Sequence, residues 1–405
     1  MATLRPYLIR LTPSGSFFFG GERNLSGTGN ESYFVHSRHF PQQTSLLGML
    51  RFQILAAYGL LDKPHKGGKI KTNAPQSKLA SAQLIGETSF QPGHNKGFGK
   101  IAAISPVLLC RDSNFFAPML SAQIPYNEVQ QGKFGSIFEE EVHDYLPNLN
   151  GYDPKHTPDA MLYGTGGQSP VRMDDVFKEK TSVGIAKNKR HFPWLFNREK
   201  KKDTEPAEME GFFKQVSYFF KDNWSFAFLA WIEEDAAGKL SEHATSNPWA
   251  TIGAERSVFR FEMELCEPLP DMTPAFPLPE SDFVRVVLLS DAWVDPDEIY
   301  KTCRFAHAET QDLRFLQSNV RTTANYYRRE INQSNDTFLT RSMQYHLFRK
   351  GSVFFCKNNE VEPLKDILKN SLFDKNPSAF RRIGYNAFAE VHSKIQVNYF
   401  NPDNQ

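Results

Sequence analysis

The sequence predicts an α+β fold built on antiparallel sheets. Several strand-like segments alternate polar and apolar residues, which indicates sheets with one face in water. Helical segments lie between the strands in irregular order, unlike the regular alternation of a doubly wound parallel sheet. The chain has 405 residues, and a prior of about 150 residues per domain suggests two or three domains.

The first half begins with a predicted strand and a predicted helix. Residues 7–11, YLIRL, have strand-forming side chains. Apolar residues then recur every three to four positions, which predicts a helix with this apolar face: Leu46, Leu47, Leu50, Ile54 and Tyr58. We expect Thr44 or Ser45 to cap its N-terminus and Gly59 to end it. Gly48 costs such a helix about 1 kcal/mol, so we expect a strand or a nucleic-acid backbone to approach it.

The rest of the chain contains two irregular regions and four further predicted strands. Residues 62–100 and 120–180 lack sustained periodicity and are expected to be insertions. The predicted strands are residues 224–231, 257–265, 283–289 and 352–356. In the second of these, Phe259, Phe261, Met263 and Leu265 face one side of the sheet. Residues 314–333 have a helical composition and carry Arg314, Arg321, Arg328 and Arg329.

Composition limits the protein class without naming a partner. The sequence has 47 Lys and Arg against 46 Asp and Glu, so any nucleic-acid site depends on local clustering of charge. Its 40% hydrophobic content excludes disorder throughout. The four cysteines form no CxxC pair, which argues against a zinc knuckle or a disulfide framework. No apolar run reaches the ~18 residues that cross a bilayer, and we expect a cytoplasmic protein without membrane contact.

Common catalytic and cofactor motifs are missing from the sequence. There is no Walker A pattern and no GxGxxG after a strand, and the glycine-rich residues 163–167 lack a following Lys-Ser/Thr. HExxH, GxSxG and carboxylate clusters at metal-ligand spacing do not occur either. We therefore expect no cofactor and no metal site.

Two histidines are the best candidates for acid–base chemistry. His36 and His39 lie in residues 33–40, YFVHSRHF, beside an arginine and a tyrosine. Such a histidine could take the proton of an RNA 2′-hydroxyl without a metal. It could equally well only hydrogen-bond an RNA backbone, and no partner acid can be named.

The clearest charge cluster is residues 187–202, KNKRHFPWLFNREKKK. It holds seven Lys or Arg against one Glu, with a histidine, a tryptophan and two phenylalanines between them. Cations neutralise phosphates and exposed aromatic faces stack on bases, so the mixture suits single-stranded RNA. A solvated loop with one apolar tuck is the alternative.

In order along the chain, several segments resemble the RAMP superfamily of CRISPR proteins, in particular subunit three of the Cmr complex of type III-B systems. Residues 40–51, FPQQTSLLGMLR, are similar to the family's helix start. The other similar segments are residues 104–109 with 115–118, 181–185, 252–256, 350–355 and 382–386. They cover nearly the whole chain and occur in the family's order.

The resemblance implies two ferredoxin-like (RRM-like, RAMP) units with antiparallel sheets, packed together and carrying long insertions. The first would be residues 1–205 with a basic, thumb-like insertion at 186–205, and the second residues 206–405 with a closing glycine loop at 383–386. It also implies a non-catalytic ribonucleoprotein subunit in antiviral defence. Such a subunit would bind the repeat-derived 5′ handle of the crRNA and bridge the large polymerase-like subunit to the first backbone RAMP subunit. Target RNA would be contacted only indirectly.

Carried over residue by residue, the resemblance places RNA contacts near the first helix, in the thumb and near the closing loop. The amides at a helix start favour a phosphate. The expected contacts are Arg23, His36, Arg38, Gln43, Thr44, Ser45, Arg51, Lys187, Asn188, Lys189, Arg190, Arg256, Arg381, Arg382 and Tyr385.

Two other functions stay open from the residues. The first is a metal-independent RAMP endoribonuclease that processes precursor crRNA through His36 or His39. The second is a β-rich scaffold that contacts only proteins.

Overall fold

The computed structural model describes most of the chain. The described residues are 3–21, 23–25, 32–61, 75–87, 89–90, 97–120, 160–186, 211–221, 223–253, 255–276, 284–303, 305–314, 316–320, 337–369, 378–392 and 396–398.

The largest sheet in the described residues has nine strands, and β11 (Trp224–Glu233) lies near its centre. β11 pairs antiparallel with β1 (Leu4–Pro13) on one side and with β4 (Ile101–Ile104) and β5 (Leu108–Arg111) on the other. Beyond β1 the order continues through β13 (Ser257–Leu265) and β12 (Trp249–Ile252). Beyond β5 it continues through β6 (Asn114–Leu120), β7 (Ala160–Gly164) and β8 (Val171–Arg172).

A second sheet is formed by the last third of the chain. Its order is β15 (Phe305–His307), β20 (Val353–Cys356), β14 (Val284–Leu288), β21 (Phe388–Val391) and β22 (Gln396–Asn398). All of its strand pairs are antiparallel. The strands are rich in valine and phenylalanine, whose branched or aromatic side chains pack well on a pleated surface.

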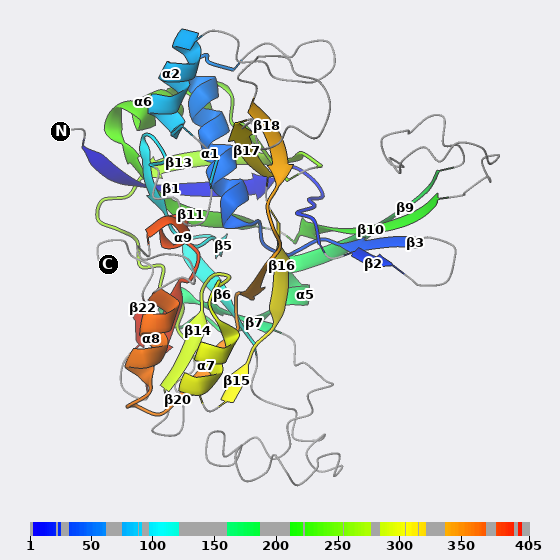
Figure 1. Ribbon diagram of the computed structural model, residues 1–405, viewed down its shortest axis with the longest axis vertical. Helices are drawn as coiled ribbons and strands as arrows, with labels where there is room; N and C mark the ends of the chain where they lie inside the picture. The colour runs from blue at the N-terminus through cyan, green and yellow to red at the C-terminus, as the bar shows by residue number, and fades with distance from the viewer. Residues whose placement is uncertain are drawn as a thin grey trace.

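The two sheets and their helices form four layers (Figure 1). The helices α1 (Gln43–Ala57), α2 (Pro75–Ile85) and α6 (Glu234–Ser246) cover one face of the nine-stranded sheet. Its other face packs on the five-stranded sheet. The outer face of the five-stranded sheet is covered by α7 (Pro296–Thr302) and α8 (Val361–Lys369). Each sheet therefore has helices on one face only, the α+β arrangement of two packed units.

Strand β11 shows how the sequence builds these layers. Its large residues Phe226, Phe228 and Ile232 enter the helix-facing core. Its alternate residues Leu229 and Trp231 enter the core between the sheets. Both faces are buried, so the strand is apolar without alternation, as a central strand between two layers must be.

A third sheet extends from the body as an arm (Figure 1). It has the order β2 (Arg23–Leu25), β3 (Ser32–His36), β10 (Gly211–Phe220) and β9 (Phe177–Ala186). Gly211 lies opposite Ala186 at the far end of the β9–β10 pair. The sequence that joins them contains the basic, aromatic residues 187–202, which lie outside the described residues.

Short elements complete the described fold. Two-stranded ribbons pair β16 (Thr310–Leu313) with β19 (Tyr345–Phe348) and β17 (Leu316–Val320) with β18 (Thr337–Arg341). The short helices are η1 (Thr165–Gly167), α5 (Met173–Val176) and α9 (Ser378–Arg382).

The α+β class and the predicted strands are confirmed. Strand β13 alternates as expected, with Phe259 and Phe261 buried and Arg260 exposed between them. Leu265, at the end of the strand, is exposed. The four cysteines are free thiols, three of them buried.

Several local expectations were wrong. Helix α1 starts two to three residues earlier than expected: Gln42 is its N-cap, and Thr44 and Ser45 lie inside it. Gly59 follows the helix with a positive φ, as predicted. A Cβ on Gly48 would meet no atom within 4 Å, so no strand of the described chain packs there.

The irregular regions contain more structure than their composition indicated. Helix α2 lies within residues 62–100, and β7, β8, α5 and the start of β9 lie within 120–180. Part of the expected helix at 314–333 is strand β17, because pairing with the distant β18 outweighs local composition. Residues 321–333 lie outside the described residues.

The division of the chain between the sheets differs from the expected domain boundary. The strands of the nine-stranded sheet come from residues 4–265, and those of the five-stranded sheet from residues 284–398. β1 pairs with β11 and β13, so the first sheet crosses the boundary expected between residues 205 and 206.

Within the described residues, no helix is long and apolar enough to cross a membrane. The same part of the chain holds no group of three or more His, Cys, Asp or Glu side chains arranged to bind a metal ion.

Candidate nucleic-acid interface

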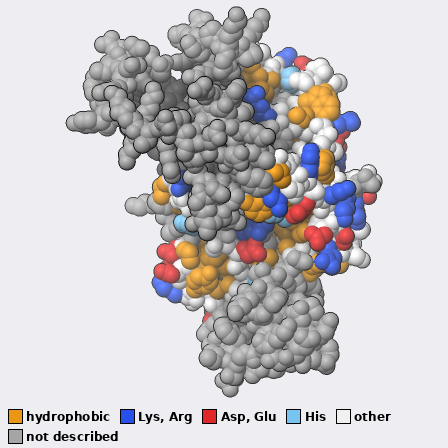
Figure 2. Space-filling model, turned by 90° about the vertical axis from the view of Figure 1, so that its right-hand side faces the viewer, with side chains coloured by type: hydrophobic (Ala, Val, Ile, Leu, Met, Phe, Trp, Pro, Cys, Tyr) orange, Lys and Arg blue, Asp and Glu red, His pale blue; other side chains and the backbone are white. Residues whose placement is uncertain are grey.

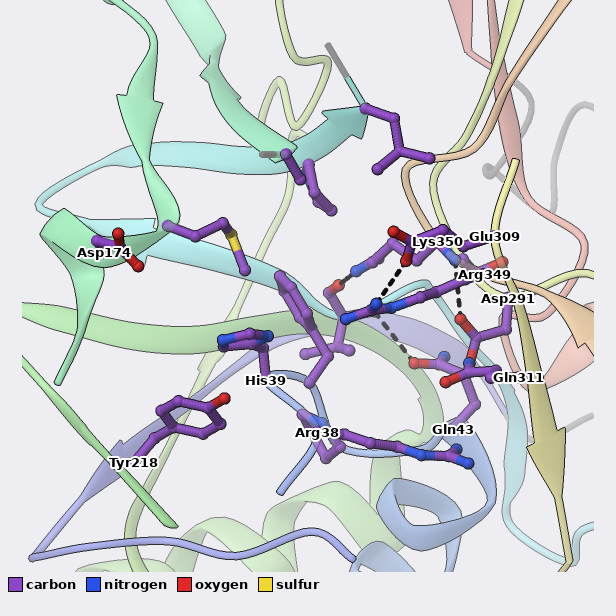
Figure 3. Close-up of a pocket in the computed structure, with 18 of the residues that line it drawn as sticks. Arg38, His39, Gln43, Asp174, Tyr218, Asp291, Glu309, Gln311, Arg349 and Lys350 are labelled. Atoms are coloured by element: carbon purple, nitrogen blue, oxygen red, sulfur yellow. Dashed lines mark hydrogen bonds and ion pairs between the residues drawn. The ribbon is translucent and has the colours of Figure 1, made fainter. Parts of the chain in front are cut away.

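A cavity of about 290 Å³ lies where the two halves of the molecule meet (Figure 3). One wall is the segment between β3 and α1, with Arg38, His39 and Phe40. The opposite wall comes from the C-terminal half, with Arg349 and Lys350. The base of the arm closes a third side. The volume is at the lower end of the ~300–1,000 Å³ typical of small-ligand pockets, so the cavity suits a single nucleotide rather than a duplex.

Arg38 and His39 line the cavity and each carries a buried polar atom without a partner in the described part of the chain. Arg38 donates one Nη2–H to the carbonyl of Asp312, which joins the segment before α1 to strand β16. Its Nη1 and the Nδ1 of His39 have no hydrogen-bond partner in the described part of the chain. Buried polar atoms normally have partners, so these two atoms indicate a site for a ligand or water.

His39 is held as a neutral, aromatic wall. Its ring stacks on Tyr218 with centroids 4.4 Å apart. Burial, with smaller effects of Arg349 and His36, lowers the pKa of His39 to about 4. The uncharged imidazole therefore offers a flat face and a hydrogen-bonding nitrogen at neutral pH.

The C-terminal wall contains two cations with different partners. Arg349 forms an ion pair with Glu309, with Nη1 2.5 Å from Oε2. Lys350 instead donates its Nζ–H to the carbonyl of Val107 and lies over the ring of Phe40, 4.2 Å from the centroid. Burial lowers the pKa of the Lys350 amine to about 7, against a smaller opposing effect of Asp291.

Gln43, the first residue of α1, links the segments around this cavity through side-chain hydrogen bonds. Its Nε2 donates to the carbonyls of Ser105, at 2.9 Å, and Ile383, at 2.7 Å, and its Oε1 accepts from the amide of Val107. The glycine at 384 has φ +85°, and a Cβ there would lie 2.2 Å from Gln43 Nε2. Gly384 is therefore required for close packing against the first residue of α1.

Charges of both signs surround the cavity. Asp174, Glu179, Asp291 and Glu309 line it together with the cations. On the face shown in Figure 2, the visible Lys and Arg side chains are interspersed with Asp and Glu. Among the described residues, the cavity therefore offers a few individually positioned hydrogen-bond donors rather than a broad basic surface.

The expected contacts Arg51 and Arg382 meet at a different place. Both guanidinium groups lie against the ring of Phe98, with Cζ 5.5 Å and 4.6 Å from the centroid. Arg51 is 9% exposed, and burial lowers its pKa to about 10. Arg382 donates to the carbonyl of Ala102. These positions give both arginines a packing role. Arg381 beside them is half-buried.

Other expected contacts near α1 differ in accessibility. Gln43 and Tyr385 are 4% and 1% exposed, so neither side chain lies at the surface for an RNA base to stack on or bind. Burial raises the pKa of the Tyr385 hydroxyl. Thr44 and Ser45 are half-buried in the first turn of α1.

His36 and Arg256 do not line the cavity. His36 is exposed at the end of β3, with its ring edge on Phe34, and Arg256 is exposed in the turn between β12 and β13. Arg23 lies in β2, on the arm. Lys187, Asn188, Lys189 and Arg190 lie outside the described residues.

Several residues that line the cavity were not predicted from the sequence. Among them are Tyr218, Asp291, Glu309, Arg349 and Lys350. The adjacent cations Arg349 and Lys350 before Gly351 were the available signal, but their approach to Arg38 depends on tertiary contacts that no local pattern records.

Comparisons with known proteins give the family. No curated protein matches the chain. Among solved structures, the chain is similar at 12% identity to chains of two type III-B Cmr-beta complexes. The match to the first, bound to cognate target RNA and AMPPnP, has a TM-score of 0.42 and spans 95% of this chain and 96% of the chain in that structure. The match to the second, bound to cognate target RNA, has a TM-score of 0.44 and spans 98% and 99%.

A chain of a Csm1-Csm4 cassette in complex with cA4 is similar at 11% identity, with a TM-score of 0.28 and 87% of each chain covered. The model of the family described as CRISPR-associated protein (Cas_Cmr3) matches residues 140–392, more than half of the chain. The chain therefore belongs to the Cas_Cmr3 family of CRISPR-associated proteins.

Proposed function

We propose that this chain is a non-catalytic subunit that binds the repeat-derived 5′ handle of crRNA at the cavity and along the arm. The observation that carries the proposal is the pair of unsatisfied cavity atoms, Arg38 Nη1 and His39 Nδ1, beside an aromatic wall. The cation suits a phosphate, and the stacked imidazole suits a splayed base. The basic, aromatic sequence 187–202 continues from the arm strands. Family membership supports RNA as the ligand.

The proposal is tested by RNA binding of an Arg38→Ala variant. Removing one phosphate contact is expected to weaken binding of repeat-derived RNA about tenfold and to reduce the salt slope by about one. Arg260→Ala is the matched control, because Arg260 is 60% exposed on strand β13, away from the cavity lining. Fluorescence anisotropy across a salt series measures both quantities in the assembled complex. Equal affinities of the two variants, or affinity that ignores salt, would contradict the proposal.

We further propose that the chain joins the large polymerase-like subunit to the first backbone RAMP subunit, a role that family membership supports. Co-purification tests it directly. Removal of this chain is expected to separate the two neighbours on a sizing column, whereas a complex that stays intact would contradict the bridging role.

The endoribonuclease alternative is weakened by the state of His39, since a neutral imidazole of low pKa is a poor base and carries no proton to donate. His36 is tested by incubating repeat RNA with the protein in EDTA. We expect no cleavage, and product that disappears in His36→Ala would establish the alternative.

A further inference from the structure

Lys350 is an amine inside the cavity without a carboxylate to neutralise it. In the described chain it forms no ion pair: its Nζ donates to the carbonyl of Val107 and faces the ring of Phe40. The nearest candidate partner, Asp291, uses Oδ1 to accept the backbone N–H of Lys350 at 2.9 Å. A carbonyl and a ring face stabilise an ammonium far less than a carboxylate does, so burial favours the neutral amine.

The other charges around Lys350 are largely committed elsewhere. Glu309 pairs with Arg349, and Arg38 bonds the carbonyl of Asp312. His39 is neutral. The titratable and charged groups that line the cavity with Lys350 are Arg38, His39, Arg172, Asp174, Glu179, Tyr218, Asp291, Glu309 and Arg349.

An RNA phosphate in the cavity would change this balance. A negative charge within a few ångströms stabilises the ammonium form, while the free Nη1 of Arg38 offers the same phosphate a second donor. We propose that Lys350 couples RNA binding to proton uptake: above neutral pH the amine is largely uncharged in the free protein and becomes an ammonium when a handle phosphate enters. This inference rests on the proposed function and adds its pH regulation.

The coupling has a defined sign and size. Burial holds the pKa of free Lys350 at about 7, so at about pH 8 roughly nine in ten molecules carry the neutral amine. If the bound amine stays protonated, binding takes up about 0.9 proton, and affinity falls about tenfold from pH 6 to pH 8. Binding by permanently charged residues such as Arg38 has no such dependence.

The experiment is titration calorimetry of the assembled complex with repeat-derived RNA at about pH 8, in buffers of different ionisation enthalpy. This pH lies above the ordinary titration range of histidine, ~6.5. We expect an uptake of about 0.9 proton in the wild type and near zero in Lys350→Arg, which keeps the charge at every pH. Lys350→Met is the second variant: it should bind more weakly, also without proton uptake. Lys239→Arg, with a side chain 55% exposed on α6, is the matched control and should behave as wild type.

The outcomes separate the two proposals. RNA binding without proton uptake, or uptake that persists in both Lys350 variants, overturns the coupling and leaves RNA binding intact. Absence of RNA binding in the wild type overturns the proposed function and the coupling with it.

Discussion

The buried Lys365 and the half-buried Lys350 have opposite surroundings. Lys365 on α8 is 7% exposed and pairs with two carboxylates, Glu390 at 2.9 Å and Glu362 at 2.5 Å. Lys350 in the cavity has a carbonyl and an aromatic ring instead. The first lysine is charged and fixed as part of the structure, whereas the second is left uncompensated at a junction open to a ligand. The difference teaches that the missing counter-charge at Lys350, more than the presence of a cation, singles out the cavity as the proposed binding site.

The largest expected effect separates the two lysines by stability. Lys365→Met leaves Glu390 buried without its main counter-charge and is expected to cost about 4 kcal/mol of unfolding free energy. Lys350→Met removes an amine that the folded state holds largely neutral at about pH 8, and it leaves no buried charge unpaired, so it should not destabilise the protein. Urea denaturation at that pH measures both. Equal losses would mean that the two environments are energetically alike.

The next effect concerns how the cavity is held together. Gln43→Leu deletes the three hydrogen bonds that join α1 to Ser105, Val107 and Ile383. Unsatisfied backbone groups remain buried, so we expect a loss of about 3 kcal/mol. These bonds are neutral, so the loss should be independent of salt, unlike that of an exposed ion pair. Gln53→Leu, nearer the C-terminal end of α1 and with one side-chain hydrogen bond, to the carbonyl of Trp249, is the comparison and should lose less.

The smallest effect is a pH dependence of stability caused by Lys350 in the free protein. The unfolded lysine has a pKa of ~10.4, and burial lowers the folded value to about 7. Between these values the unfolded chain binds more protons, so stability rises with pH. From about pH 7 to about pH 9 the wild type should gain about 2 kcal/mol relative to Lys350→Met. A difference between the two that stays flat over this range would show that the amine is charged in the folded state.

Local sequence patterns predicted the framework well. The alternation in 257–265 and the apolar run in 224–231 report burial on one or two faces, and both segments form the expected strands. Turn chemistry also worked at Gly59, which takes the left-handed conformation after α1.

The candidate site was harder to predict, because burial and long-range contacts decide it. Arg51 looked like a phosphate contact beside a helix start, but its side chain is buried between α1, to which it belongs, and the ring of Phe98. Gln43 looked like an RNA contact, but its side-chain amide donates hydrogen bonds to two carbonyls inside the protein. Lys350 meets Phe40 across some three hundred residues of sequence, a proximity that no periodicity or motif encodes. Arg38 and His39 were both selected from the sequence, line the cavity and carry a polar atom that has no partner among the described residues.

The insertion of the loop at Gly384 against the first residue of α1 has a consequence during synthesis. Residues 38–43 leave the ribosome early, but the wall that Gln43 holds needs Ile383 and Gly384, which follow hundreds of codons later. A nascent chain therefore cannot present a finished pocket until translation of this polypeptide is nearly over.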